Sequence, residues 1–303
     1  MSATLTPRVL VLLATRNGAE HIDALLQSLS AQQGVDLRVD VADDDSSDGT
    51  PGILAVHANH DTRFRLLTLH EAGGSAAANF LRLFRAADLS EVDFLAFADQ
   101  DDIWHADRLI CGVDQLRAHQ ADLWSCATRA FWPDGTQRVL QQQAVMTAAD
   151  YLFEGAGQGC TFLLGGGFAR QLQPLLIEHA ARLHGVFFHD WAVYAAARAL
   201  GKRWIFDSSV HLDYRQHGSN EAGARASLSG VTKRMRLIHG GWYAQQVALI
   251  ADWVAELSPA DAGLRGWRKA RSRLARVVWL ARNGRRRRSD RMLQIFAAVT
   301  GYL

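Results

Sequence analysis

Two apolar segments of this 303-residue chain each run directly into a cluster of aspartates. Residues 94–98 are followed by three aspartates at positions 99–102, and the alternating segment 39–42 is followed by three more at 43–45. A buried strand that ends in several carboxylates is costly unless a cation compensates their charge. Open α/β sheets bind ligands at the carboxyl ends of their strands. The pattern therefore predicts two strands of one sheet with an acidic crevice at their ends.

The first part of the chain alternates between strand and helix patterns. This alternation favours an α/β fold with a mainly parallel sheet covered by helices on both faces. From about residue 232 the pattern is helical throughout. Strands are expected at residues 8–14, 37–42, 63–69 and 94–98, early helices at 20–32, 50–60 and 106–119, and late helices at 242–257, 262–283 and 290–303.

The composition excludes several classes of protein. Hydrophobic residues make up 49% of the chain, which is enough for one large or two modest domains. A net charge of +2 gives no global electrostatic footprint for nucleic acid. The cysteines Cys111, Cys126 and Cys160 lack metal-like spacing, which indicates a reducing compartment. No secretory signal and no apolar stretch of about 20 residues is found, so we expect a cytoplasmic protein that meets a membrane only peripherally.

The aspartates at 99–102 have two interpretations. Mg²⁺ and Mn²⁺ prefer carboxylate oxygens, so the cluster is a candidate site for a divalent ion that carries a phosphorylated substrate. A polar turn in which Asp102 or Asp107 caps the next helix would explain single aspartates, but not three acids after an apolar strand. The earlier cluster could likewise be a plain turn before a helix. A calcium-binding EF-hand is excluded there, because the twelfth loop position is Leu54 or Ala55 and not glutamate.

Four motifs follow one another along roughly residues 8–225. Two of them, at 14–18 and 43–50, stand at the ends of expected strands. The third, at 99–104, reads D-Q-D-D-I-W, and the fourth combines H-D-W at 189–191 with Y-R-Q-H-G-S-N at 214–220. In this order they resemble the motifs of the inverting family-2 glycosyltransferases, in particular bacterial rhamnosyltransferase-like members. The third and fourth motifs together are specific, whereas many sugar-nucleotide enzymes share the first two.

The resemblance implies a fold, an organisation and a reaction. The fold is of the GT-A type, with a glycosyltransferase domain over residues 1–225 and a basic helical extension over 226–303. The reaction is transfer of a sugar, rhamnose by resemblance, from a dTDP- or UDP-sugar to a saccharide acceptor in cell-surface polysaccharide synthesis. Two positions depart from the family pattern. Arg16 stands where tyrosine is common, and Asp45 stands where glycine is usual, although aspartate tolerates the left-handed conformation better than most residues.

The resemblance also implies roles for acidic residues and one histidine. Asp101 is the expected direct ligand of Mn²⁺ or Mg²⁺, Asp99 contacts the ribose or the metal, and His217 is a further candidate ligand. A turn histidine that bonds its own backbone is the alternative for His217. Asp190 is the expected general base, since inverting transfer uses one carboxylate opposite the leaving group. The alternative for Asp190 is an N-cap of the helix that begins beside it.

Further residues are expected to bind the donor or the acceptor. A carboxylate at Asp44 can accept the imide N–H of uracil or thymine, and the guanidinium of Arg16 can stack on a base. Asn79 is a candidate lining residue, although simple helix polarity would also explain it. Trp104 and Trp191 are candidate acceptor contacts, with burial in the core as the alternative. The expected donor-binding residues are Thr15, Arg16, Asn17, Asp44, Asn79, Asp99 and Gln100.

The segment from Arg265 to Arg291 is rich in arginine, interleaved with Trp267 and Trp279. This basic amphipathic pattern predicts attachment to an anionic membrane surface, at the cytoplasmic leaflet, which suits a lipid-linked saccharide acceptor. A solvated helical face, a packing or oligomer surface, and a nuclear signal or nucleic-acid patch are the alternatives.

Two other functions stay open at this stage. A HAD-like phosphohydrolase would use Asp43 as nucleophile and Asp45 as acid, but it needs a later lysine, and Lys202 and Lys233 are poorly placed. A catalytically silent protein that binds a sugar nucleotide or a lipid is the other alternative, against which Asp190 argues.

Overall fold

The computed structural model describes residues 5–69, 73–141, 145–217 and 240–303. The chain folds into two compact units. The first comprises Met1–Gln142, Gly157–His179 and Lys202–Gln216, and the second comprises Gln143–Ala156, Ala180–Gly201 and His217–Leu303. The predicted domain boundary at residue 225 lies outside the described residues.

The first unit is built on one sheet, which has nine strands among the described residues. Its order is β3-β2-β1-β4-β8-β6-β9-β5, and β7 pairs with β6. The neighbouring strands β3, β2, β1 and β4 are parallel to one another, whereas β8 runs antiparallel to β4 and to β6. The sheet is therefore mixed beyond β4. The strands are β1 Arg8–Thr15, β2 Asp36–Asp43, β3 Phe64–Leu66, β4 Phe94–Asp99, β5 Ile103–Trp104, β6 Leu123–Phe131, β7 Gln137–Leu140, β8 Phe162–Gly165 and β9 Trp204–Arg215.

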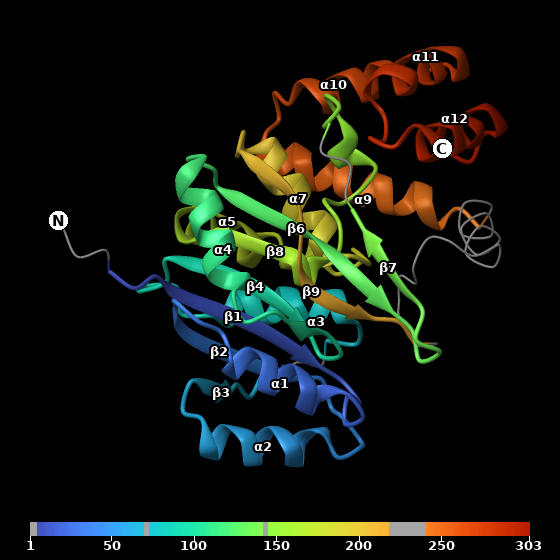
Figure 1. Ribbon diagram of the computed structural model, residues 1–303. Coiled ribbons are helices and arrows are strands. Elements are labelled where there is room, and N and C mark those ends of the chain that lie inside the picture. Colours follow the sequence, from blue (N-terminus) through green and yellow to red (C-terminus); the bar gives the residue numbers. More distant parts are fainter. Residues whose placement is uncertain (1–4, 70–72, 142–144, 218–239) are drawn as a thin grey trace. The chain divides into compact units, whose positions relative to one another are not determined.

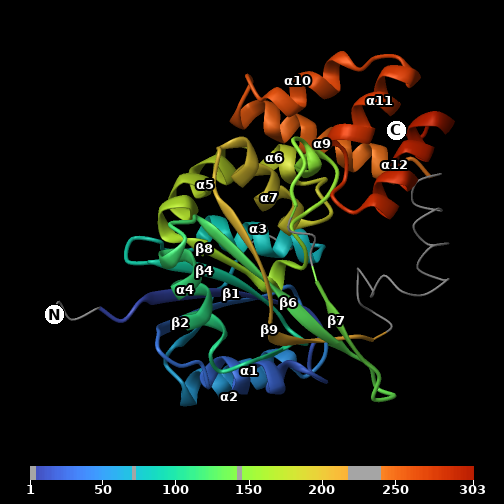
Figure 2. The same ribbon diagram turned by 45° about the horizontal axis from the view of Figure 1, so that its top comes forward.

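Helices cover both faces of this sheet, as Figures 1 and 2 show, and the predicted α/β class is confirmed. Helices α1 and α2 pack together, and α3 packs beside α5 and against β1. Strand β1 is buried along almost its whole length, because helices on both faces exclude water from it. The helices are α1 Ile22–Ser30, α2 Thr50–His60, α3 Ala76–Ala86, α4 Arg108–Ala118 and α5 Gly166–Glu178.

Strand register brings the two aspartate clusters to one edge of the sheet. The last residue of β1, Thr15, pairs with Asp43 of β2, and the preceding Ala14 pairs with Asp99 of β4. Because β1 lies between β2 and β4 and pairs with both in parallel, the two acidic turns lie at the same edge of the sheet, one on either side of the end of β1. The predicted acidic strand ends are confirmed.

The second unit is helical. It contains the 3₁₀ turn η1 at Asp150–Leu152, and α7 packs against α9. The predicted single helix over 262–283 is wrong, because the helix is interrupted between α10 and α11. The side chain of Ser272 caps α11 by accepting from the N–H of Ala275. No helix in the described part of the chain is long and apolar enough to cross a membrane. The helices are α6 Ala180–Leu183, α7 His189–Ala199, α9 Trp242–Leu257, α10 Ala262–Lys269, α11 Arg273–Asn283 and α12 Arg288–Thr300.

Candidate active site

The ends of β1 and β2 are joined by side-chain hydrogen bonds. The hydroxyl of Thr15 donates to Asp43 at 2.7 Å, and the backbone N–H of Ser46 donates to the same carboxylate at 2.8 Å. Asn17 accepts from the N–H of Ser47 at 2.8 Å. The first two motifs therefore form one hydrogen-bonded turn, in which Thr15 and Asn17 organise the backbone.

Asp44 is buried and surrounded by donors. Its carboxylate accepts from the backbone N–H groups of Gly73 and Gly74. The guanidinium of Arg82 on α3 lies 3.1 Å away, and that of Arg16 lies 3.4 Å away. Sequence reasoning missed Arg82, although an arginine between apolar residues of that helix was a usable signal. These donors fix the orientation of the carboxylate at the strand ends.

Asn79 is buried beneath this turn. Its amide nitrogen lies 3.2 Å from the carbonyl of Ala42 and 3.4 Å from that of Thr15, and its oxygen accepts from Arg82 at 2.9 Å. These bonds tie α3 to the ends of β1 and β2 and orient the arginine that faces Asp44. A direct contact between Asn79 and a donor stays a prediction.

Gln100 links the third motif to the first. Its side-chain oxygen accepts from the N–H of Arg16 at 2.8 Å, and its nitrogen donates to the Arg16 carbonyl at 2.9 Å. An added Cβ at Gly18 would collide with this amide, so a side chain there would displace Gln100 from the Arg16 backbone. Gln100 thus holds the Arg16 backbone, and the half-exposed Arg16 side chain reaches towards Asp44.

Asp99 belongs to a compact group of possible metal ligands. Asp99, Asp102 and Cys160 each offer one ligand atom, and these atoms lie within 4.8 Å of one another. Burial raises the pKa of Asp102 well above its usual range, and the carboxylates of Asp101 and Asp99 raise this pKa further. Oδ2 of Asp102 is buried with no N–H or O–H partner among the described residues. A divalent cation fits the acidic turn that holds this group, because it would compensate the carboxylates of Asp99, Asp101 and Asp102, which now disfavour one another's charge.

The end of β9 packs against the same acidic turn. The N–H of Arg215 lies 3.4 Å from Oδ1 of Asp102, and its Nε donates to the carbonyl of Asp101 at 3.0 Å. Burial raises the pKa of Tyr214, and the nearby Cys160 and Asp99 also raise this pKa. The tyrosine and arginine of the fourth motif therefore lie at the third motif. His217 follows at the start of the next segment of the second unit, and its role as a ligand stays a prediction.

Trp104 is buried in the first unit. The guanidinium of Arg108 lies 3.4 Å from the centre of its ring, and Arg108 also donates to the carbonyl of Cys160. Asp107 occupies the N-cap position of α4 without a side-chain capping bond. Burial of the tryptophan favours the core alternative, and an acceptor contact by Trp104 stays a prediction.

In the second unit, Asp190 is the second residue of α7. The N-cap position belongs to Phe188, so the capping alternative does not describe Asp190. A carboxylate in the first turn of a helix is nevertheless stabilised by the helix dipole. His189 beside it is buried, and burial lowers the pKa of this imidazole to about 3. Asp190 itself is only partly buried, which leaves it accessible to solvent or substrate.

Trp191 points into the interior of the second unit. Its indole N–H donates to the carbonyl of Tyr151 at 2.8 Å, and its ring stacks on Tyr243 at 6.3 Å between centroids. The polar atom and the ring of this side chain are therefore both engaged in packing within the unit, and an acceptor contact by Trp191 stays a prediction.

Comparisons with known proteins agree with this geometry. The sequence model of Glycosyl transferase family 2 matches residues 10–175. The chain is 31% identical to the dTDP-rhamnosyl transferase RfbG of Shigella flexneri over 245 residues, which cover 80% of this chain and 85% of that protein. The chain belongs to glycosyltransferase family 2. Membership of this family rules out the alternative of a HAD-like phosphohydrolase.

Other glycosyltransferases resemble the chain over shorter segments or in structure alone. The glucosyltransferase WfgD of Escherichia coli, described as a UDP-Glc:alpha-D-GlcNAc-diphosphoundecaprenol beta-1,3-glucosyltransferase, is 36% identical over 36% of this chain and 40% of its own length. The mannosyltransferase PcManGT from Pyrobaculum calidifontis, in complex with GDP-Man and Mn²⁺, superposes with a TM-score of 0.53 at 18% identity over 99% of this chain and 88% of that one. TarS of S. aureus with UDP-GlcNAc gives 0.53 at 16% identity over 96% and 81%. These likenesses confirm the predicted GT-A fold.

Proposed function

We propose that this family-2 glycosyltransferase transfers a sugar from a nucleoside diphosphate to a saccharide hydroxyl with inversion, in the synthesis of a cell-surface polysaccharide. The observation that supports it most directly is the edge of the sheet, where the buried Asp44 follows β2 and Asp99, grouped with Asp102 and Cys160, ends β4, on the other side of β1. A nucleotide sugar offers one group to each site. The imide N–H of its base would bind the carboxylate of Asp44, and a cation held at the second site would neutralise its diphosphate.

Recognition of the nucleoside belongs to the first two motifs. The fixed carboxylate of Asp44 is suited to accept the imide N–H of thymine or uracil, and cytosine lacks that group. Arg16 would stack on the base, while Thr15, Asn17, Asn79 and Gln100 keep the surrounding backbone in place. The similarity to a dTDP-rhamnosyl transferase supports dTDP-rhamnose as the donor.

Mn²⁺ or Mg²⁺ would be held by Asp101 and Asp99. When bound, the ion neutralises the negative charge that grows on the diphosphate as it leaves. The buried Asp102 fixes the turn through its contact with the backbone of Arg215, and His217 is a candidate further ligand. Carboxylate oxygens are suitable ligands for either ion.

Asp190 would act as the general base. It takes the proton of the acceptor hydroxyl as that oxygen attacks the anomeric carbon, while the bond from this carbon to the diphosphate oxygen breaks on the opposite face. The nucleoside diphosphate leaves with the electron pair. Trp104 and Trp191 stay candidates for acceptor contact only if the packing around their rings opens.

The acceptor is proposed to be linked to a lipid, and the enzyme to attach peripherally to the cytoplasmic face of an anionic membrane. The name of the relative WfgD includes a diphosphoundecaprenol acceptor, which supports this chemistry. Helices α11 and α12 expose apolar side chains among arginines, as an interfacial surface requires. The exposed apolar residues are Leu274, Val278, Met292, Phe296 and Val299.

The variant Asp190→Asn tests the reaction. It should bind the donor with unchanged affinity and lose turnover by at least about a hundredfold, the low end for a positioned proton-transfer group. Turnover is measured as release of nucleoside diphosphate, with water as acceptor where no saccharide is known. Asp252→Asn, at an exposed position of the same unit, is the matched control and should keep full turnover. Comparable turnover by Asp190→Asn would exclude the base assignment.

A further inference from the structure

Gly155 lies beside the start of α7, the helix that carries the proposed base. A Cβ added at this glycine would lie 3.3 Å from Cα of Trp191 and 3.5 Å from Oδ1 of Asp190. The first of these distances is tighter than an ordinary packing contact, so a side chain would push the start of α7, the helix that carries Asp190, by a few tenths of an ångström. Glycine at this position therefore allows the loop to support Asp190 closely.

Arg286 holds this loop from the other side. Its Nη2 donates to the carbonyl of Gly155 at 2.7 Å, and its Nη1 donates to Asp150 at 2.6 Å. Its backbone N–H donates to the carboxylate of Glu154. The Nε of Arg285 lies 3.4 Å from the same carboxylate. One buried side chain from the turn between α11 and α12 thus fixes the loop at its start and beside Asp190.

The same anchor reaches helix α7. Asp150 is fully buried and accepts from Tyr194 at 2.6 Å and from Arg198 at 2.6 Å, and both of these residues belong to α7. Since Arg286 donates to Asp150 as well, the loop and the helix that carries Asp190 share one carboxylate. Burial of these charges is tolerable because each is paired and hydrogen-bonded.

We propose that Arg286 and Gly155 are positioning residues for Asp190, an inference that rests on the proposed function of Asp190 as base. Arg286 fixes the Gly155 carbonyl, and the Gly155 backbone limits where the carboxylate can lie. Small errors in the position of a catalytic group are expensive in rate, so a rigid support of this kind is useful. The arginine-rich C-terminal segment then has a part in turnover that is separate from any attachment to a membrane.

The first test is Gly155→Ala in the full chain. Its turnover number for nucleoside diphosphate release should fall by about tenfold, because a displacement of about 1 Å costs up to about a hundredfold and this one is smaller. Donor affinity, measured by titration calorimetry, should be unchanged. Gly52→Ala is the matched control, because an added Cβ meets nothing within 4 Å there. Full turnover by Gly155→Ala would overturn the proposal.

The second test is Arg286→Lys, with Arg182→Lys at an exposed ion pair of the same unit as control. A lysine ammonium cannot replace the planar fork that binds Gly155 and Asp150 together, so turnover should fall while donor affinity stays constant. If this buried change prevents folding, Gly155→Ala alone carries the test.

A double variant separates positioning from general stability. In an Asp190→Asn background, Gly155→Ala should change the residual turnover by less than about twofold, because the group it positions is already gone. A loss as large as in the native background would show that Gly155 acts elsewhere and would overturn the proposal. Undiminished turnover of Asp190→Asn alone would instead overturn the proposed function.

Discussion

At the scale of single residues, His189 and Asp190 are consecutive but have opposite environments. His189 is buried, and burial lowers its pKa to about 3, so it stays neutral in the folded chain at ordinary pH. Asp190 is partly exposed at the same helix start. One residue of this motif therefore serves packing and the next is available for chemistry, a division that the letters H-D-W do not reveal.

The buried imidazole makes stability depend on pH. The unfolded chain takes up a proton at His189 near pH 6.5, whereas the folded chain takes it up only near pH 3. Between these values the unfolded state binds more protons, so the free energy of unfolding falls as pH falls, by up to about 1.4 kcal/mol per pH unit. Between pH 6.5 and 5, the free energy of unfolding of His189→Gln should therefore fall by up to about 2 kcal/mol less than that of the native chain. Urea unfolding at both pH values measures this, and parallel curves would contradict it.

Asp45 shows how far a single letter can be interpreted in advance. Aspartate stands here where the family has glycine and tolerates the left-handed conformation better than most residues, and its φ of 55° lies in that region. The partners of Asp44 could not be predicted in the same way. Arg82 lies 38 positions further along the chain, and only the packing of α3 against β1 brings it to this carboxylate.

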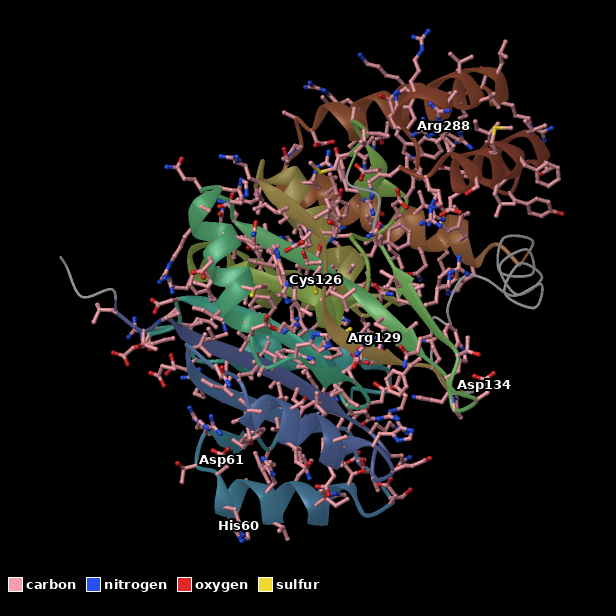
Figure 3. The ribbon with its side chains drawn as sticks, in the orientation of Figure 1. His60, Asp61, Cys126, Arg129, Asp134 and Arg288 are labelled. Atoms are coloured by element: carbon pink, nitrogen blue, oxygen red, sulfur yellow. The ribbon has the colours of Figure 1, made fainter. Side chains whose placement is uncertain are left out.

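At the scale of elements, the strand ends were predictable and the C-terminal helices were less so. A short continuous apolar run that ends abruptly at aspartates is typical of a buried strand, so β4 and its acidic turn could be located from the sequence. The break between α10 and α11 depends on one capping serine inside an otherwise continuous pattern. The arginines between and at the start of the last two helices also differ in environment. Arg286 is buried against Asp150, whereas Arg288, labelled in Figure 3, is exposed at the start of α12.

Helices α11 and α12 should carry the proposed attachment to membrane. Residues 262–303 contain twelve basic residues and one acidic residue, Asp290. Each basic residue near an anionic surface contributes about 1 kcal/mol, and salt screens this attraction over about 10 Å. The chain should co-sediment with anionic vesicles at low salt, less at high salt, and not with neutral vesicles.

A matched pair of variants locates this contact. Met292→Gln combined with Phe296→Gln removes exposed apolar side chains of α12 and should weaken vesicle binding, whereas Val56→Gln, equally exposed on α2, should not. Equal binding to anionic and neutral vesicles, or to neither, would remove the membrane proposal. The exposed apolar side chains would then be a packing or oligomer surface.

At the scale of the whole molecule, the chain combines a sheet-based unit with a helical one. The first carries the two acidic motifs at the ends of β2 and β4, which flank β1, and the second carries Asp190 beside Gly155. Sequence patterns predicted the sheet and its acidic edge, because these depend on local periodicity. They could not predict that residues 145–156 join the C-terminal helices, because Asp150 and Arg286 are 136 positions apart and meet only in the folded unit.

The central claim is that the acidic edge of the sheet binds a nucleotide sugar with a divalent ion for transfer. The most direct measurement is release of nucleoside diphosphate from dTDP-rhamnose and UDP-sugars, with Mn²⁺ or with chelator, by the native chain, Asp101→Asn and the exposed control Asp114→Asn. We predict Mn²⁺-dependent release by the native chain and the control, and severe loss in Asp101→Asn. Undiminished release by Asp101→Asn, or cleavage of simple phosphate esters in place of nucleotide sugars, would contradict the account.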